Sequence, residues 1–405
     1  MNVFVARQPI LDRKGMLVGY ELLFREGLDN YFQTLNGDQA TGRLISSSFF
    51  SMGIEQFTGG KKAFINFTDN LLKCDIATIL PQDSVIIEIL ETVEPDPEII
   101  EACKNLKKAG YQLALDDFVL TPAIIPLLQY ADIIKVDFLA TRPEHRRVLC
   151  ERLGGKVKFL AEKVETVEAY QEALGIGYQY FQGYYFSKPV IIEGKDISLS
   201  QRNALRLLKE VYREEFDIEY IEQIIKADVS LSYKLIKFIN SSFFGFKSKI
   251  SSIRQALALL GHQELKKWVS LITMGNINEE KPHELVVEAN IRATFAEALA
   301  LELGLGEKSS EAFLMGLFSV IDAVLDQPMN DICKVLPLSD DIIRAFQGSK
   351  NVYRDILDLI ICYEKGDWLK LNDIVNELNL VQMRIPQLYV QSLKKADLFI
   401  AQGIA

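Results

Sequence analysis

Two adjacent aspartates, Asp116 and Asp117, directly follow the apolar run at residues 113–115. Neighbouring carboxylates repel each other unless a cation, a proton or strong hydrogen-bond donors hold them, so the pair needs a chemical reason. Hard divalent cations such as Mg²⁺ and Mn²⁺ take oxygen ligands of this kind. The pair therefore raises the hypothesis of a metal site, and structural ion pairing is the alternative.

Further polar side chains stand at the ends of other short apolar runs. They are Glu21, Asn66, Glu88, Lys135, Asp137, Glu162 and Gln182. Any one of them alone is better explained by a structural salt bridge, because such pairs are common. Together with the two aspartates, however, the acidic members outnumber the nearby basic residues Lys135 and Arg25, and an ion is the simplest partner that would balance them.

The elements that must position these residues alternate between short β-rich runs and amphipathic helical patterns up to about residue 190, which indicates βαβ units. The predicted strands cover residues 18–25, 63–67, 84–90, 112–117, 132–137, 157–162 and 178–186. One predicted helix covers residues 97–109 and stops at Gly110, a residue suited to a left-handed helix end. A series of such units predicts a TIM-type (β/α) barrel with a parallel sheet. In that fold, polar residues at the carboxyl ends of the strands meet on one face.

The pattern changes after the barrel-like half. Residues 193–200 form a polar linker with serines that could cap a new helix, and residues 201–405 show amphipathic helical periodicity with few strand-like runs. The predicted organisation is therefore a barrel domain over residues 1–192, the linker, and an all-α domain over residues 201–405.

Bulk properties exclude several classes of protein. The net charge is −10 without a long basic run, which argues against a nucleic-acid or anionic-membrane surface. No apolar stretch is long enough to span a bilayer, and the N-terminus lacks the pattern of a signal peptide. The five cysteines form no C-x-x-C pair and suit reduced, buried thiols. These features predict a cytoplasmic protein.

Residues 8–189 resemble the EAL domain, which hydrolyses the bacterial second messenger cyclic di-GMP. The likeness is carried by several motifs in the family's order. They are Glu21-Leu22-Leu23 with Arg25, the INF of Asn66, the EILE of Glu88, LALDDF, the IKVD of Lys135, the AEKVET of Glu162, and the FQGYYFSKP of Gln182. The resemblance implies one or two Mg²⁺ or Mn²⁺ ions, held by Glu21, Asn66, Glu88, Asp116, Asp117 and Glu162.

The same resemblance implies the remaining roles. Lys135, with Glu21 and Glu162, would serve catalysis by activating a metal-bound water, while Arg25 and Gln182 would contact the substrate. Two divalent ions a few ångströms apart can both generate the nucleophile and balance charge on the phosphate. The expected small-molecule partner is cyclic di-GMP.

The loop after the paired aspartates departs from the family. Catalytic members continue as Asp-Asp-Phe-Gly-Thr-Gly or similar, whereas this chain reads Asp116-Asp117-Phe118-Val119-Leu120-Thr121-Pro122. Valine and leucine disfavour the positive φ angles that glycine allows, and the proline restricts its predecessor. Lys163 also replaces a family glycine. We therefore expect a weakly catalytic or non-catalytic sensor or adaptor; the alternative is an active phosphodiesterase that converts cyclic di-GMP to linear pGpG.

The second half resembles an HDOD domain, a relative of the HD phosphohydrolases, through residues 231–269. HD enzymes hold metal with several histidines, but this chain has only His145, His262 and His283, and Ser319-Val320 stand where the His-Asp pair would be. The expected role is therefore binding of a protein partner, and a homodimer is a further expected assembly. Three aromatic residues, Phe243, Phe244 and Phe246, either anchor that partner or fill the domain's own core.

Overall fold

The computed structural model describes residues 3–26, 54–74, 76–183, 199–213, 215–241, 244, 250, 252–276, 283–325, 328–334, 336 and 338–401. The chain divides into two compact units. The barrel unit comprises Met1–Phe186, Ile361–Asn376 and Val381–Pro386, and the helical unit comprises Ser187–Ile360, Glu377–Leu380 and Gln387–Ala405. The domain boundaries given above for the two halves stay a prediction.

The barrel unit contains the predicted (β/α) barrel. Its described strands are β1 (Val3–Asp12), β2 (Leu17–Glu26), β3 (Lys62–Phe67), β4 (Val85–Ile89), β5 (Gln112–Leu115), β6 (Ile133–Asp137), β7 (Lys158–Glu162) and β8 (Tyr180–Phe181). They close into a barrel in sequence order, and every pair from β2 to β8 is parallel. The fold prediction is confirmed.

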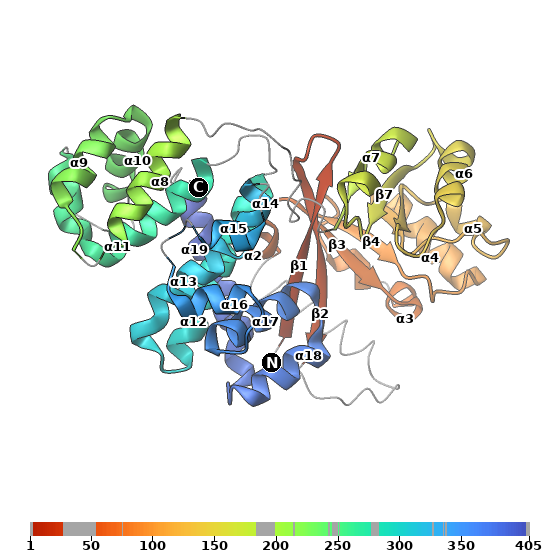
Figure 1. The fold of residues 1–405 in the computed structure, drawn as a ribbon. Helices are drawn as coiled ribbons and strands as arrows, with labels where there is room; N and C mark the ends of the chain where they lie inside the picture. The colour runs from red at the N-terminus through yellow and green to blue at the C-terminus, as the bar shows by residue number, and fades with distance from the viewer. Residues whose placement is uncertain are drawn as a thin grey trace. The chain divides into compact units, whose positions relative to one another are not determined.

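Strand β1 is the one strand that the sequence analysis missed, and it runs antiparallel to both of its neighbours, β2 and β8. Figure 1 draws β1 and β2 as two long adjacent arrows. A short turn joins them, in which Asp12 Oδ1 accepts hydrogen bonds from the Lys14 and Met16 amides at 2.8 and 2.9 Å. A connection this short can join only antiparallel strands, since parallel strands need a long crossover.

Helices lie outside the strands in Figure 1. In the barrel they are α2 (Glu55–Thr58), α3 (Asp69–Lys73), α4 (Pro97–Lys108), α5 (Ile125–Leu128), α6 (Pro143–Leu153) and α7 (Val167–Ile176). The predicted helix at residues 97–109 corresponds to α4. The Asp96 side chain caps its N-terminus by accepting from the Ile99 amide, and Gly110 follows its end with a φ of 92°.

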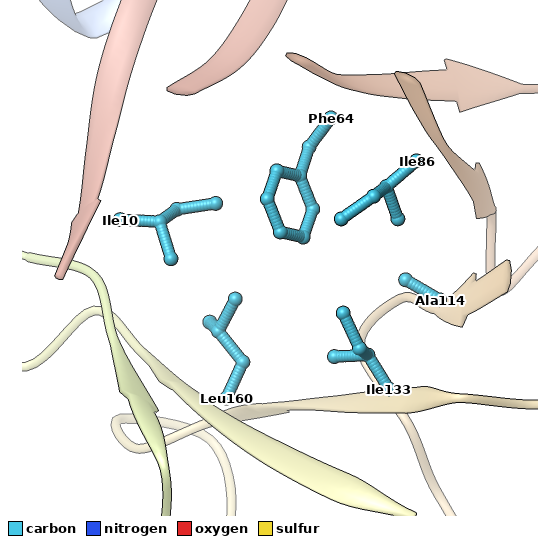
Figure 2. Packing of buried hydrophobic residues seen from close by; sticks show 6 residues of the cluster. All are labelled: Ile10, Phe64, Ile86, Ala114, Ile133 and Leu160. Carbon is cyan, nitrogen blue, oxygen red and sulfur yellow. The ribbon is translucent and has the colours of Figure 1, made fainter. Parts of the chain in front are cut away.

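An apolar layer fills the barrel interior, as Figure 2 shows. Its six side chains come from six strands and point toward one another: Ile10, Phe64, Ile86, Ala114, Ile133 and Leu160. Each is almost completely buried. A barrel of this kind is therefore a packed core rather than a pore, and it gives the polar residues above it a rigid floor.

The helical unit confirms the expected all-α second half. Its helices are α8 (Leu199–Val211), α9 (Ile218–Lys226), α10 (Val229–Ile239), α11 (Ile253–Asn276), α12 (His283–Glu302), α13 (Ser309–Phe318), α14 (Ile321–Leu325), α15 (Met329–Ile332), α16 (Asp340–Phe346), most of α17 (Val352–Lys365) and most of α19 (Ile385–Ala401). In the described part of the chain, no helix is both long and apolar enough to cross a membrane.

A segment from near the C-terminus completes the barrel unit. It contains the end of α17 and nearly all of α18 (Trp368–Glu377). The ring of Phe4 on β1 lies 6.1 Å from that of Tyr363 and 5.8 Å from that of Trp368. Gly366 approaches β2 so closely that a Cβ there would lie 3.0 Å from a Leu23 methyl carbon. Aromatic packing thus joins the two ends of the sequence within one unit.

Candidate functional site

The polar site lies one step above the apolar layer of the barrel. Side chains two residues apart on a strand point to the same face, so each residue two positions beyond a floor residue enters the barrel mouth. The floor and site residues pair as Phe64 with Asn66, Ile86 with Glu88, Ala114 with Asp116, Ile133 with Lys135, and Leu160 with Glu162. The strand period therefore brings together residues that are far apart in the sequence.

Two amides orient Glu21 on β2, and a third amide holds one of them. Gln182, which follows β8, donates through Nε2 to Glu21 Oε2 at 2.7 Å and to Gln8 Oε1 at 3.0 Å. Asn66 Nδ2 donates to Glu21 Oε1 at 3.4 Å. Gln8 is the register partner of Glu21 across the β1–β2 hairpin. Both oxygens of the Glu21 carboxylate are thus held in place from neighbouring strands.

The ammonium of Lys135 lies among four carboxylates. Its Nζ is 2.7 Å from Asp116, 2.9 Å from Glu88, 2.9 Å from Glu162 and 3.6 Å from Glu21. Lys135 and Glu88 are completely buried. A buried ion cluster is stable only when its charges are compensated, and here one ammonium faces four acids.

Burial and mutual repulsion shift the pKa values of these groups. Burial raises the pKa of Glu88 well above its usual range, and it raises those of Asp116 and, to about 8, Glu162, in each case against the attraction of Lys135. For Glu21, the lysine and the amide hydrogen bonds outweigh burial and lower the pKa. The pKa of Lys135 is raised because the carboxylates outweigh its burial. The mouth therefore holds more acidic groups than it can ionise alone.

Several buried oxygen atoms at the barrel mouth have no hydrogen-bond partner. Among the described residues, the buried atoms without a hydrogen bond include Glu88 Oε1 and Oε2, Asn66 Oδ1, Asp117 Oδ1 and Gln182 Oε1. Glu88 Oε1 still has its ion pair with Lys135. Buried oxygens in native proteins normally find partners, so this set suits a ligand that supplies positive charge.

The donor set fits a hard divalent cation in its chemistry, since it consists of carboxylate and amide oxygens with excess negative charge. The geometry of these side chains differs from that of a metal-bound site. In the described ranges, no three acidic, histidine or cysteine side chains are arranged so that they could coordinate one metal ion. The Lys135 ammonium takes the central place. The acids predicted as ligands are thus brought together, with a lysine between them.

The loop after β5 has a fixed path at its start. The Asp116 amide donates to Ile89 O at 2.9 Å, and the Phe118 amide donates to Lys135 O at 3.0 Å. Asp117 between them has a φ of 38°, and Phe118 is buried. Val119, where the family has glycine, is 68% exposed. The chain thus enters this loop through a strained aspartate and then turns an apolar side chain to solvent.

Comparison with known proteins identifies both halves. The family model for the EAL domain matches residues 33–189, and that for the HDOD domain matches residues 198–328. The protein YuxH of Bacillus subtilis, which is uncharacterized, is 40% identical over 94% of this chain and 95% of its own length. The chain belongs to the EAL–HDOD family.

Two further proteins similar to this EAL–HDOD protein are known with an activity or a bound ligand. The cyclic di-GMP phosphodiesterase CdgJ of Vibrio cholerae is 39% identical over 91% of this chain and 86% of its own length. The Klebsiella pneumoniae protein BlrP1, solved with manganese and cyclic di-GMP, is 24% identical over 45% of this chain and 55% of that one, with a TM-score of 0.39. The EAL match begins at residue 33, so Glu21 lies outside the matched residues.

The helical half of the EAL–HDOD protein has a polar cluster at Ser319, which the resemblance to HD enzymes predicts to be the position of their His-Asp pair. Ser319 Oγ donates to Gly316 O at 2.7 Å and accepts from Arg292 Nη1 at 3.2 Å. Arg292 is buried and also forms an ion pair with Glu288. A guanidinium therefore occupies this position in the described structure, and its charge is matched by a neighbouring acid.

The histidines are dispersed rather than clustered. His145 lies on α6 of the barrel, and His283 begins α12. His262 follows a non-helical Gly261 within α11, stacks on Phe216, and lies with Nε2 2.9 Å from Val211 O. His262 therefore begins the segment of α11 that follows the kink at Gly261.

The proposed aromatic anchor is only partly described. Phe244 packs edge-on against Phe238 at 4.9 Å between ring centroids, and Phe238 is buried. This contact favours the core interpretation for Phe244. Phe243 and Phe246 lie outside the described residues.

The structure differs from the predicted site at two residues, Arg25 and Gln8. Arg25 lies four positions beyond Glu21 on β2, ~13 Å along the strand at the usual rise per residue, so it stands beyond the ion cluster. Gln8 was not predicted, although it contacts Gln182 in the mouth. Recognition of β1 as a strand would have found it, because Ile10 of the floor lies two positions away.

Proposed function

We propose that this protein is a cyclic di-GMP signalling protein whose barrel mouth binds the nucleotide together with a divalent cation, and turns it over slowly at most. The observation that carries the proposal is Glu88: a fully buried carboxyl group whose Oε2 lacks a hydrogen bond and whose Oε1 meets the Lys135 ammonium that three further acids share. A site with more acids than cations attracts metal ions and the phosphates that metal ions bind.

The metal ion, Mg²⁺ or Mn²⁺, would be held by Glu21, Asn66, Glu88, Asp116 and Glu162, with Asp117 available to a second ion. When bound, the metal supplies a more acidic water and balances charge on the phosphate. Gln182 donates to the Glu21 carboxylate and is itself held by Gln8, so we assign Gln182 first to positioning that ligand. Its free Oε1 leaves a second role in contacting substrate open.

Lys135 would act as a cation and donor rather than as a base. Its pKa is raised by the surrounding carboxylates, so it keeps its proton at neutral pH and can hold a water or a phosphate oxygen by donation. Glu162, with a pKa of about 8, holds a proton near neutral pH and is the better proton carrier. Arg25, beyond the cluster, would meet the more distant part of the nucleotide.

Slow turnover follows from the loop after Asp117. Val119 to Pro122 lack the glycines that the family uses there, while Phe118 remains buried. The second candidate function is a fully active phosphodiesterase that releases linear pGpG, and the identity with the phosphodiesterase CdgJ favours it. The two candidates share the same site and differ in rate.

Calorimetric titration with cyclic di-GMP, with and without Mn²⁺, tests the proposal, alongside a turnover assay for linear pGpG. We expect metal-dependent binding, turnover at least about a hundredfold below an ordinary kcat of about 10 s⁻¹, and loss of that turnover in Glu21→Gln. Metal-independent binding that is unchanged in Glu21→Gln would reject the site. Brisk turnover by the wild type would select the phosphodiesterase.

For the helical half we propose a non-catalytic role in binding a protein partner. Its support is the cluster of Arg292, Ser319 and Glu288, which fills the position of the HD metal pair with a matched ion pair. A metal-dependent phosphatase activity that survives in Glu21→Gln and is lost in Arg292→Met would contradict this role.

A further inference from the structure

The loop after β7 holds Lys163 in an unusual backbone conformation. Glu162 O accepts from the Phe138 amide at 3.1 Å, and the Val164 amide donates to Gln182 O at 3.0 Å, so both neighbours of Lys163 are fixed. Lys163 itself has a φ of 52°. The adjacent loop comes so near that a Cβ on Gly183 would lie 2.2 Å from Val164 O. The path of this backbone is therefore imposed by its surroundings.

A lysine in this conformation carries a cost that glycine would avoid. Left-handed geometry is unfavourable for a residue with a Cβ, whereas glycine adopts it freely. The Lys163 side chain is 52% exposed, so burial of its methylenes offsets little of that cost. Strain at the rim of a candidate site points to a functional reason for the side chain. The reason must lie in what the ammonium contacts.

The ammonium contacts the outer acids of the mouth. Lys163 Nζ lies 2.5 Å from Asp137 Oδ2 and 3.9 Å from Asp117 Oδ1. The other oxygen of Asp137 accepts from the Leu139 and Ala140 amides, so this carboxylate is held on both sides. Burial would raise the pKa of Asp137, but the hydrogen bonds from Lys163 and from these amides together lower it.

The mouth therefore has an inner and an outer set of charges. The inner set is Lys135 with its four carboxylates, and the outer set is Lys163 with Asp117 and Asp137. The inner set retains a large excess of acid. In the outer set one ammonium serves two carboxylates, one of which, Asp117, belongs to the proposed metal ligands. A divalent ion approaching Asp117 would meet the positive charge of Lys163.

We propose that Lys163 is a tethered cation that takes the outer of two divalent-ion positions, so that the mouth binds a single divalent ion at the inner carboxylates. The inference rests on the proposed function, because it assumes that the mouth binds metal. Repulsion between the ammonium and an incoming ion, together with competition for Asp117, weakens the second site. The side chain is half-exposed, so solvent screening keeps the expected effect at roughly tenfold to a hundredfold in affinity.

Mn²⁺ titration of the full chain by calorimetry, with electron paramagnetic resonance of the bound ions, tests the inference without any assay of activity. Lys163→Asn removes the charge and keeps a residue that tolerates left-handed geometry. Lys163→Arg keeps the charge. We expect one ion per chain in the wild type and in Lys163→Arg. In Lys163→Asn we expect a second ion, bound at least about tenfold more tightly than in the wild type, with spin coupling between the two.

Lys73→Asn is the matched control, because Lys73 on α3 pairs with Asp96 at 2.7 Å, an ion pair that contains none of the mouth residues named above. It should titrate like the wild type. Equal numbers of ions and equal affinities in the wild type and Lys163→Asn would overturn the inference and leave the metal site standing. A second ion in Lys73→Asn would also overturn it, since the effect would then be one of total charge. Absence of Mn²⁺ binding in every variant would remove the proposed function and the inference with it.

Discussion

The barrel mouth and the Arg292 cluster of the helical unit both bury charge, but they balance it differently. At the mouth one ammonium faces four carboxylates, three of which have raised pKa values. In the helical unit, the buried Arg292 forms an ion pair with Glu288 and lies near a second acid, Asp322. An arginine with a close acid partner is largely compensated, whereas one ammonium among four carboxylates calls for a ligand. Charge imbalance therefore separates the candidate site from the structural one better than burial does.

The largest expected effect comes from removing the central cation of the mouth. In Lys135→Met the buried carboxylates lose their compensation, so the free energy of unfolding of the barrel should fall by about 3–5 kcal/mol without metal. Millimolar Mn²⁺ should restore a large part of the loss. Urea unfolding in EDTA and in Mn²⁺ measures both.

Arg292→Met is the counterpart in the helical unit. It removes the cation that pairs with Glu288, so a loss of stability is expected there as well. Mn²⁺ should restore much less of that loss than at the mouth, because this ion pair contributes one carboxylate where the mouth contributes four. Recovery of both variants by Mn²⁺, or of neither, would break the contrast between the two clusters.

The next effect is the stabilisation that metal gives the wild type. A ligand at a hundred times its Kd stabilises the folded state by about 2.7 kcal/mol, so Mn²⁺ should raise the melting temperature of the barrel. Asp116→Asn should lose most of that rise. Asp322→Asn, a change to a largely buried acid near Arg292, serves as the control and should keep it. An equal rise in Asp116→Asn would place the metal elsewhere.

A smaller effect is expected from the loop after Asp117. Replacing Val119-Leu120-Thr121 by Gly-Thr-Gly restores backbone freedom and should raise hydrolysis of cyclic di-GMP at least about tenfold, equivalent to about 1.4 kcal/mol of barrier. Pro122 restricts its predecessor, so a second graft should replace it as well. The same graft with Glu21→Gln should be inactive. A graft that binds metal and nucleotide yet gains no rate would show that this loop does not limit turnover.

The smallest effect concerns pH. Glu162 has a folded pKa of about 8 against an ordinary value of 4.5, so between these values the folded chain holds a proton that the unfolded chain has lost. Without metal, stability should therefore fall as pH rises from about 5 to 8, by at most about 1.4 kcal/mol per unit for this group. Mn²⁺ must displace the proton, so its affinity should rise over the same range. Denaturation and titration at pH 6, 7 and 8 measure the two opposite slopes, and parallel slopes would contradict the assignment.

The barrel and its acidic mouth could be predicted from sequence because strand geometry is local. A period of two residues places Glu88 above Ile86 and Asp116 above Ala114 wherever those strands pair. Strand β1 was missed because it contains Arg7 and Gln8, and no helix follows it. Because β1 was missed, Gln8 was missed too, since only the antiparallel pairing of β1 with β2 brings Gln8 beside Glu21.

Other features had no local signal. The position of the Lys135 ammonium depends on a long side chain that responds to all four acids at once, so strand spacing could not place it between them. Lys163 could be recognised as a replaced glycine, but its left-handed backbone and its contact with Asp137 depend on neighbouring loops. The pairing of Phe4 with Trp368 joins residues at opposite ends of the chain, which no local pattern can reveal.

That last contact has a consequence for how the protein is made. The barrel unit ends its first stretch at Phe186 and resumes at Ile361, so a ribosome must synthesise the intervening residues before the aromatic partners of Phe4 exist. At ordinary rates of synthesis, that interval lasts roughly 10 to 35 seconds. During it, β1 carries an apolar ring that has not yet met Tyr363 or Trp368. The nascent barrel therefore lacks these aromatic contacts of Phe4 until the last part of the chain has been made. A fragment that ends at residue 192 would lack them permanently.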